Sequence, residues 1–323
     1  MENKNGATEK ESRILVAGIG GVGGLLAGPL IRTYGDAVSL MARGDRKEYL
    51  KKNGLTLHSD VYGEFTVHPA VVTDDPSKLP RQDLILICVK NSDLAACITQ
   101  LLPVIGKDTI LVPVMNGISA GEMLRKSVSC GIVCDSVIYT VSGTQEDFSV
   151  RQTGNFTNVL IGSMESDPAA VLSAKGVSEL LQNAGINGRY REDVRKEIWK
   201  KFILNCAYNV VTAARGVPIG VIVNNTQWVE EYNTLLEEAW RVSCAEGVGL
   251  DAAVVEEFKN RLYTYTPDSE SSLSRDFAHH REGEWQIFSS EVIRRADRTG
   301  VEVPMTRKYE CLMRERIAKW NKQ

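Results

Sequence analysis

The stretch that decides the fold is Arg13-Ile14-Leu15-Val16-Ala17-Gly18-Ile19-Gly20-Gly21-Val22-Gly23, close to the amino terminus. Residues 14–17 form a short apolar run that is typical of a buried strand. The glycines are followed by a helical pattern up to about Tyr34 and then by a second apolar run over residues 37–41. A strand, a glycine turn, a helix and a strand in this order indicate the start of a βαβ unit.

The glycine spacing in this turn is that of a dinucleotide-binding loop. Gly18 permits a tight turn, Gly20 lets the backbone approach a pyrophosphate, and Gly23 lets the helix pack closely on the strand. The N–H groups at the start of the helix would face the anion. The alternative is a glycine-rich turn without a ligand. We predict that the cofactor contacts the whole turn, which consists of Gly18, Ile19, Gly20, Gly21, Val22 and Gly23.

The remaining sequence divides into two parts with different patterns. Up to about residue 192, apolar runs at 66–72, 84–89, 109–115 and 131–139 alternate with helical patterns, which predicts a mostly parallel, doubly wound α/β sheet of the Rossmann type. From residue 193 onward the patterns are almost all helical. We therefore predict a Rossmann domain over residues 1–192, with a disordered leader over 1–12, and an all-α domain over residues 193–323.

Composition excludes several classes of protein. The formal net charge of −3 over 323 residues offers no basic surface for nucleic acid. The sequence has no run of about 20 apolar residues that would span a membrane, and the polar residues 1–12 do not resemble a signal peptide. Seven scattered cysteines are expected to be reduced core residues rather than a disulfide framework. These features favour a cytoplasmic protein that acts on a small molecule.

The residues after the second strand predict which nicotinamide cofactor is used. An acidic residue there would bind the ribose 2′-hydroxyl of NAD, but the position is occupied by Arg43. Arg46 and Lys47 follow closely, and a guanidinium binds a phosphate with two parallel hydrogen bonds. Asp45 weakens this argument, and a solvated basic loop is the alternative interpretation. We predict a preference for NADP(H) over NAD(H).

A hydride transfer to a carbonyl also needs a proton donor, which histidine often supplies. The four histidines of this chain lie in polar segments and are expected at the surface, without the spacing of metal ligands. They are His58, His68, His279 and His280. No bound metal is predicted.

A better candidate lies in an almost wholly apolar helical segment, residues 198–213. Lys201, Asn205 and Asn209 recur there at i, i+4 and i+8, so they form one polar line on a buried helix. An unsatisfied buried polar group costs about 1–3 kcal/mol, so this line must face a partner or a wet cleft. It is either the wall of a pocket or a set of structural amides with Lys201 at the rim, and the pattern alone leaves both interpretations open.

Three further polar positions are candidates for the site. Lys90 and Asn116 directly follow apolar runs, and ligands of open α/β sheets bind at the carboxyl ends of strands. A serine-rich segment over residues 271–276 precedes Glu284, which begins a helical pattern. For each of these positions, turn or capping chemistry is the alternative.

Taken in order, these motifs resemble the ketopantoate reductase (2-dehydropantoate 2-reductase) family over residues 13–315. The matching features are GIGGVG, Val89-Lys90, Asn116-Gly117, the stretch WKKFxxNCxxNxxTA from Trp199, SSLxxD from Ser271, and Glu284. The resemblance implies a Rossmann domain joined to a helical domain of the 6-phosphogluconate dehydrogenase type, with the active site in the cleft between them. It also implies NADPH-dependent reduction of 2-dehydropantoate to (R)-pantoate, a step of pantothenate and coenzyme A biosynthesis.

The resemblance implies a role for each matching residue. Lys201 would be the catalytic acid that protonates the substrate carbonyl oxygen, and Glu284 would act beside the nicotinamide and the substrate. The binding positions would be Arg43, Lys90, Asn116 and Glu284 for the cofactor, and Asn116, Lys201, Asn205, Asn209 and Ser272 for the substrate.

Departures from the family pattern affect the substrate more than the chemistry. Arg275 and Met115 stand where the family often has glutamine, which leaves open a reductase or dehydrogenase for another branched 2-oxo or 2-hydroxy acid. A non-catalytic NADP(H)-binding sensor is the other alternative. A homodimer formed through the helical domain is a further expectation, although no interface stripe is evident in the sequence.

Overall fold

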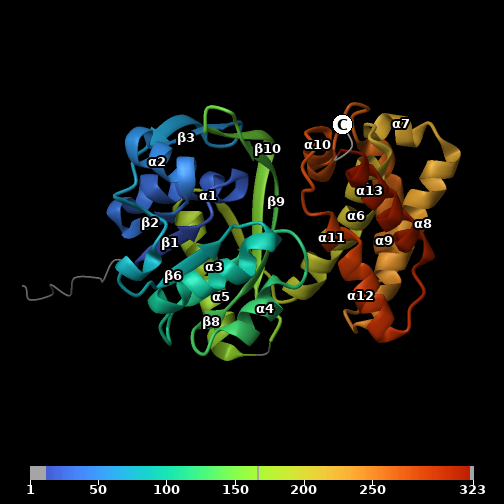
Figure 1. Ribbon diagram of the computed structural model, residues 1–323. Helices are drawn as coiled ribbons and strands as arrows, with labels where there is room; N and C mark the ends of the chain where they lie inside the picture. The colour runs from blue at the N-terminus through green and yellow to red at the C-terminus, as the bar shows by residue number, and fades with distance from the viewer. Residues whose placement is uncertain (1–11, 166, 321–323) are drawn as a thin grey trace, which may run out of the picture. The chain divides into compact units, whose positions relative to one another are not determined.

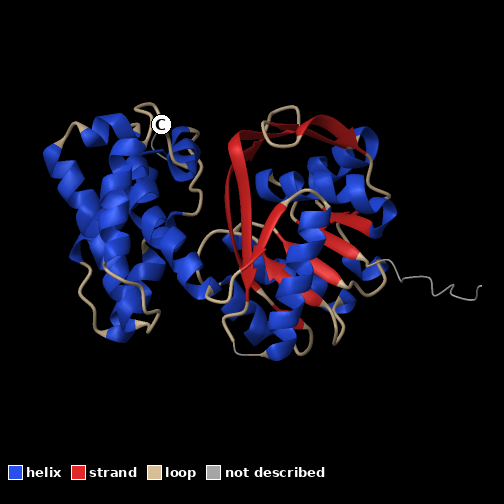
Figure 2. Ribbon diagram, turned by 180° about the vertical axis from the view of Figure 1, so that it is seen from behind, coloured by secondary structure: helices blue, strands red, loops and turns tan. Residues whose placement is uncertain are grey.

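The computed structural model describes residues 12–165 and 167–320, so the leader predicted over residues 1–12 lies outside the described residues except for Ser12. The chain forms two compact units. The α/β unit holds residues up to 115 and 119–194, and the helical unit holds 116–118 and 195 onward. The strands drawn in red all belong to the α/β unit (Figure 2).

The α/β unit is built on a six-stranded sheet in which every neighbouring pair is parallel, with the order β5-β2-β1-β6-β7-β8. This confirms the predicted Rossmann-type sheet. Because the strands are parallel, their carboxyl ends share one edge of the sheet. The strands are β1 (Ile14–Ala17), β2 (Val38–Met41), β5 (Val71–Thr73), β6 (Leu84–Ile87), β7 (Ile110–Pro113) and β8 (Ile132–Val133).

Helices cover both faces of this sheet (Figure 1). Alternate residues of β1 point to opposite faces, so Ile14 and Val16 join one buried cluster and Leu15 and Ala17 join the other. The first cluster includes the core residues of α1 and the second those of α3 and α4. The helices of this unit are α1 (Gly21–Tyr34), α2 (Gly44–Asn53), α3 (Leu94–Leu101), α4 (Ala120–Ser127) and α5 (Pro168–Asn183).

A second sheet lies on the other side of α1, which contacts strands of both sheets. It has the order β11-β10-β3-β4, with β9 antiparallel to β10. The apolar run 66–72 was expected to be a single strand, and this is wrong: the run ends β4 and begins β5 in a different sheet, because Pro69 lacks an N–H group. The strands are β3 (Leu55–Ser59), β4 (Gly63–Val67), β9 (Asp135–Thr144), β10 (Val150–Gly162) and β11 (Asn187–Tyr190).

The helical unit contains no strand among its described residues. The helical pattern that begins at Glu284 is interrupted at Ser289, whose φ of −128° and ψ of −63° are not helical. All five tryptophans of the chain, at positions 199, 228, 240, 285 and 320, belong to this unit. Its helices are α6 (Val194–Arg215), α7 (Ile219–Val223), α8 (Thr226–Ala245), α9 (Ala253–Arg261), α10 (Ser272–Ala278), α11 (Trp285–Phe288), α12 (Ser290–Thr299) and α13 (Pro304–Trp320).

Short 3₁₀ helices complete the secondary structure. They are η1 (Gly35–Ala37), η2 (Pro76–Lys78), η3 (Asn91–Asp93), η4 (Leu102–Val104) and η5 (Leu262–Thr264).

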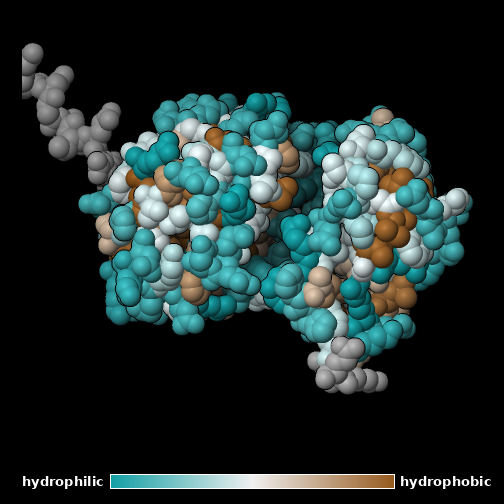
Figure 3. Space-filling model, turned by 90° about the horizontal axis from the view of Figure 1, so that it is seen from above, coloured by the Kyte–Doolittle hydropathy of each residue, from teal (hydrophilic) through white to brown (hydrophobic). Residues whose placement is uncertain are grey.

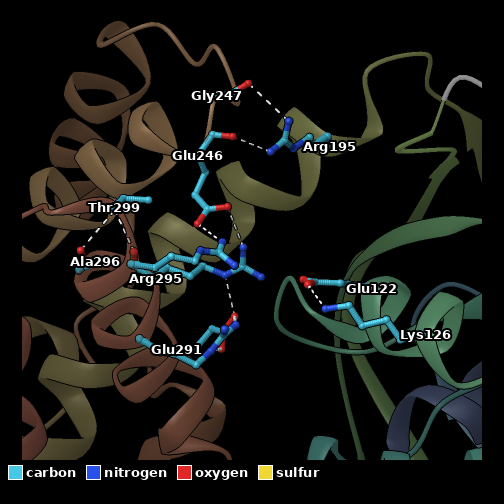
Figure 4. Close-up of polar contacts among 11 residues, drawn as sticks. Glu122, Lys126, Arg195, Glu246, Gly247, Glu291, Arg295, Ala296 and Thr299 are labelled. Carbon is cyan, nitrogen blue, oxygen red and sulfur yellow. Dashed lines mark hydrogen bonds and ion pairs between the residues drawn. The ribbon is translucent and has the colours of Figure 1, made fainter.

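Buried charges join the helices of the helical unit. Arg295 on α12 donates to Glu246 at the end of α8 over 3.0 Å and to Glu291 over 2.6 Å (Figure 4). The main chain of Glu246 also accepts from Arg195 over 2.7 Å. On the same helix α8, the buried carboxylate of Glu238 accepts hydrogen bonds from the first turn of α13. These contacts fix how α6, α8, α12 and α13 pack.

The surface of each unit that is visible in Figure 3 is mostly hydrophilic, with small hydrophobic patches. Within the described residues, helices that are long and apolar enough to cross a membrane are absent. The expectation that the cysteines are core residues is wrong for Cys130, Cys244 and Cys311, which are exposed. Cys244, for example, follows Val242 and Ser243, which are buried, because successive residues of a helix point in different directions.

Candidate active site

The glycine turn connects β1 to α1 and is constrained by close packing. Gly18 has a φ of +92°, and a Cβ there would lie 2.7 Å from Cγ1 of Val89. A Cβ on Gly23 would lie 1.9 Å from the carbonyl oxygen of Gly18. Both positions therefore require glycine, as the spacing predicts.

The middle of the turn fits a dinucleotide. A Cβ built on Gly20 would meet no atom of the described residues within 4 Å, so this backbone borders open space. Gly20 is also the N-cap of α1, whose first N–H groups have no partner within the helix. Gly21 is held differently, because a Cβ there would lie 2.8 Å from the Cα of Gly143 on β9.

The basic residues after β2 are engaged in different ways. Arg46 donates to the carbonyl oxygen of Ile19 in the glycine turn over 2.9 Å, and Lys47 pairs with Asp74 over 2.8 Å. Arg43 is the most exposed of the three, with 77% of its side chain accessible. Its guanidinium lies 2.9 Å from Asp93. Sequence reasoning missed Asp93, although an acidic residue shortly after a strand end was a usable signal.

Lys90 lies at the same edge of the sheet. It is exposed and is the N-cap of η3, directly after the strand β6 and two connecting residues. The structure therefore places Lys90 at a carboxyl strand end, where the sequence predicted a ligand-binding position.

In the helical unit, three of the predicted residues meet although they are far apart in the chain. The ammonium Nζ of Lys201 on α6 donates to Oδ1 of Asn116 over 3.0 Å. The amide Nδ2 of Asn116 donates to Oε2 of Glu284 over 3.3 Å. Asn116 stands in the short segment 116–118 that belongs to the helical unit, and Glu284 is the N-cap of α11. We name Lys201, Asn116 and Glu284 the Lys–Asn–Glu group.

The electrostatics of this group suit proton transfer near neutral pH. Burial lowers the pKa of Lys201 to about 8, and the charge of Glu284 opposes that change. Because this pKa lies close to the operating range of an enzyme, Lys201 is able to give up a proton and regain it.

The remaining residues of the polar line on α6 reach the start of α10. Oδ1 of Asn209 accepts from Oγ of Ser272 over 3.2 Å and from the main-chain N of Leu273 over 3.3 Å. One turn further along, Thr212 donates to Oγ of Ser271 over 2.8 Å. Asn209 thus fixes the position of Ser272, which is exposed, while Asn205 is half-buried one turn after Lys201.

The histidines do not join either group of candidate residues. His58 lies in β3 and faces Glu64 at 3.1 Å, and His279 and His280 are exposed after α10. Among the residues that the structure describes, no cluster of three or more His, Cys, Asp or Glu side chains has the arrangement of a metal site.

The comparisons with known proteins match almost the entire chain. The sequence family described as ketopantoate reductase PanE/ApbA matches residues 14–166, and its C-terminal part matches residues 193–314. The 2-dehydropantoate 2-reductase of Halobacterium salinarum is 25% identical over 308 residues, which cover 94% of this chain and 98% of that protein.

Solved structures agree with this match. A PanE/ApbA family ketopantoate reductase from Ralstonia eutropha has a TM-score of 0.85 and 26% identity, covering 95% of this chain and 98% of that one. D-mandelate dehydrogenase, solved with NADH and anilino(oxo)acetate, has a TM-score of 0.86 and covers 95% of this chain and 99% of that one. At 19% identity, the second structure shares the fold alone.

Proposed function

The chain belongs to the ketopantoate reductase PanE/ApbA family, and we propose that it catalyses the NADPH-dependent reduction of 2-dehydropantoate to (R)-pantoate. This is an oxidoreductase family that uses NADPH. The observation that carries the proposal is the Lys–Asn–Glu group, which joins a lysine of pKa about 8 to a carboxylate through one amide.

The residues of the α/β unit would hold the cofactor. The glycine turn would bind the pyrophosphate, Arg43 the 2′-phosphate, and Lys90 a further part of the dinucleotide. NADPH, when bound, supplies the hydride that the carbonyl carbon of the substrate accepts.

Lys201 would supply the proton. As the carbonyl carbon gains a hydride, its oxygen becomes an alkoxide, and the ammonium of Lys201 first stabilises that charge and then donates a proton to it. The product is a 2-hydroxy acid, and Lys201 recovers its proton from water. Asn116 orients the ammonium by accepting a hydrogen bond from it, and the charge of Glu284 helps to keep Lys201 protonated.

The substrate would be held by polar side chains of the helical unit. Asn205 lies on the same face of α6 as Lys201, and Ser272 is exposed at the start of α10. We propose that Asn205 binds the substrate directly and that Ser272, which Asn209 positions, binds the carboxylate.

A reductase or dehydrogenase for another 2-oxo or 2-hydroxy acid is the second candidate. Arg275 favours it, because this exposed cation on α10 stands where the family often has an uncharged amide. D-mandelate dehydrogenase, which shares this fold, is named for a 2-hydroxy acid. A sensor without activity is less favoured, since sensing does not need the Lys–Asn–Glu group.

The test is NADPH oxidation at 340 nm with 2-dehydropantoate, beside 2-oxoisovalerate and phenylglyoxylate. We expect 2-dehydropantoate to give the highest kcat/KM, and we expect Lys201→Ala to lower kcat by about 10²–10⁴-fold, as loss of a general acid does. Lys200→Ala, which removes the neighbouring ammonium that pairs with Glu197, is the matched control. Near wild-type turnover in Lys201→Ala would refute the proposed mechanism.

We further propose a cytoplasmic location, which the seven free cysteines support because reducing compartments keep thiols unpaired. A homodimer formed through the helical unit stays a prediction, to be checked by light scattering.

A further inference from the structure

The ion pair between Arg43 and Asp93 lies across the carboxyl edge of the parallel sheet. Arg43 is the second residue after β2, and Asp93 ends η3, which follows β6. The strand β1 lies between β2 and β6 in the sheet. The pair therefore joins the two loops that stand on either side of the glycine turn, where the adenosine half of a dinucleotide lies in this fold.

Both partners of this ion pair are accessible to solvent. The side chain of Arg43 is 77% exposed and that of Asp93 is 39% exposed, and their atoms Nη2 and Oδ1 are 2.9 Å apart. A solvated pair of this kind is weak, so a ligand that brings its own anion can replace the carboxylate. The pair opposes such a ligand without blocking it.

The two ribose chemistries of the nicotinamide cofactors affect this pair in opposite directions. The 2′-phosphate of NADPH needs the guanidinium of Arg43 and is repelled by the carboxylate of Asp93. The 2′-hydroxyl of NADH carries no charge, and it can donate a hydrogen bond to a carboxylate. Arg46 and Lys47 already donate to Ile19 and Asp74, which leaves Arg43 as the exposed cation of this loop.

We propose that Asp93 is a specificity-determining residue, which competes with the 2′-phosphate for Arg43 and so lowers the preference for NADPH over NADH. The inference rests on the proposed function only in placing the cofactor at this edge of the sheet. It adds that the preference is set by two opposed residues from different loops, rather than by Arg43 alone.

The experiment measures dissociation constants of NADPH and NADH by fluorescence titration, without a second substrate. We expect Asp93→Asn to tighten NADPH binding by about fivefold, which is the upper end of what one exposed ion pair contributes. NADH binding should be unchanged or weaker. The gain in NADPH affinity of Asp93→Asn over the wild type should be smaller in 0.5 M salt, where exposed charges are screened. Asp93→Glu keeps the carboxylate and should restore a ratio close to that of the wild type.

Asp108→Asn is the matched control. Asp108 is an exposed carboxylate with a neighbouring lysine, Lys107, and it lies before β7, at the opposite edge of the sheet. The substitution Asp108→Asn makes the same change in net charge as Asp93→Asn. We expect it to alter the ratio of the NADPH and NADH dissociation constants by less than about twofold.

The outcomes separate this inference from the proposed function. Tight NADPH binding without turnover of 2-dehydropantoate would refute the proposed reaction, yet the ratio of dissociation constants would still test Asp93. A ratio in Asp93→Asn within twofold of the wild type, or a change matched by Asp108→Asn, would overturn the inference. Absence of binding by either cofactor would overturn both.

Discussion

At the scale of single residues, the site depends on how Lys201 is held and charged. Its ammonium is bound by Asn116, and two opposed effects act on its pKa. Burial disfavours the charged form, whereas the carboxylate of Glu284 favours it, and burial is the larger effect. The result is a lysine that is mostly protonated at neutral pH and mostly neutral above pH 8.

The pH profile of reduction follows from this balance. Because the proposed reaction takes a proton from Lys201, kcat should be constant below the pKa of about 8 and fall as the pH rises through it. In Glu284→Gln the charge that raises this pKa is lost, so the fall should begin at lower pH, and for a pKa lowered by about one unit kcat at pH 8 should drop by about fivefold. Rate profiles between pH 5.5 and 10 measure both effects. Glu282→Gln, at an exposed carboxylate two residues away, is the control. If kcat of Glu284→Gln falls at the same pH as that of the wild type, Glu284 does not raise the pKa of Lys201.

At the scale of elements, the helical unit is fixed by contacts between helices that are distant in the chain. The start of α13 is an example, because its cap comes from α8. One carboxylate oxygen of Glu238 accepts from the main-chain N of Met305 over 2.8 Å, and the other accepts from the N and the Oγ1 of Thr306 over 2.8 and 2.7 Å. Glu238 itself is fully buried. One side chain thus satisfies backbone donors that the helix cannot satisfy itself.

The substitution Glu238→Gln keeps the volume but turns one acceptor into a donor. We expect a loss of about 2–3 kcal/mol in the free energy of unfolding, because a buried N–H group would then face another donor. Urea denaturation followed by tryptophan fluorescence measures it. Glu237→Gln removes the adjacent carboxylate, which is half-exposed and pairs with Lys259, and should cost less than about 1 kcal/mol. Equal losses in the two variants would show that the capping contacts do not matter.

At the scale of the whole molecule, the glycine turn, Arg43 and Lys90 belong to one compact unit and the Lys–Asn–Glu group belongs to the other. A ligand that binds the folded state at a hundred times its dissociation constant stabilises that state by about 2.7 kcal/mol. The proposed cofactor should therefore protect the α/β unit from opening, and most of all the segment from β1 to α2, residues 14–53.

Amide hydrogen exchange provides the measurement for this prediction. With NADPH at a hundredfold excess over its dissociation constant, exchange in peptides from residues 14–53 should slow by up to about a hundredfold. Peptides from α8 serve as the internal control and should change much less. Protection confined to the helical unit would contradict the placement of the cofactor at the glycine turn.

The features that could be predicted from the sequence are those that depend on residues close together in the chain. The turn from Gly18 to Gly23 and the line from Lys201 to Asn209 follow from local spacing, and both were predicted. The second sheet was missed, because the strand β3 pairs on one side with β10, which lies far away in the sequence. Arg43 pairs with Asp93, which lies 50 residues further along the chain, and Asn209 pairs with Ser272, 63 residues further along. Local sequence patterns do not encode contacts over such separations.

Residues 116–118 belong to the helical unit, so that unit is discontinuous along the chain. A gene fragment that encodes only residues 193–323 would specify every helix of the unit and still lack Asn116, which links Lys201 to Glu284. Exchange of helical units between relatives, whether by recombination or by design, would therefore need to transfer two separate stretches of coding sequence. The Lys–Asn–Glu group therefore cannot be passed on as a C-terminal module of residues 193–323.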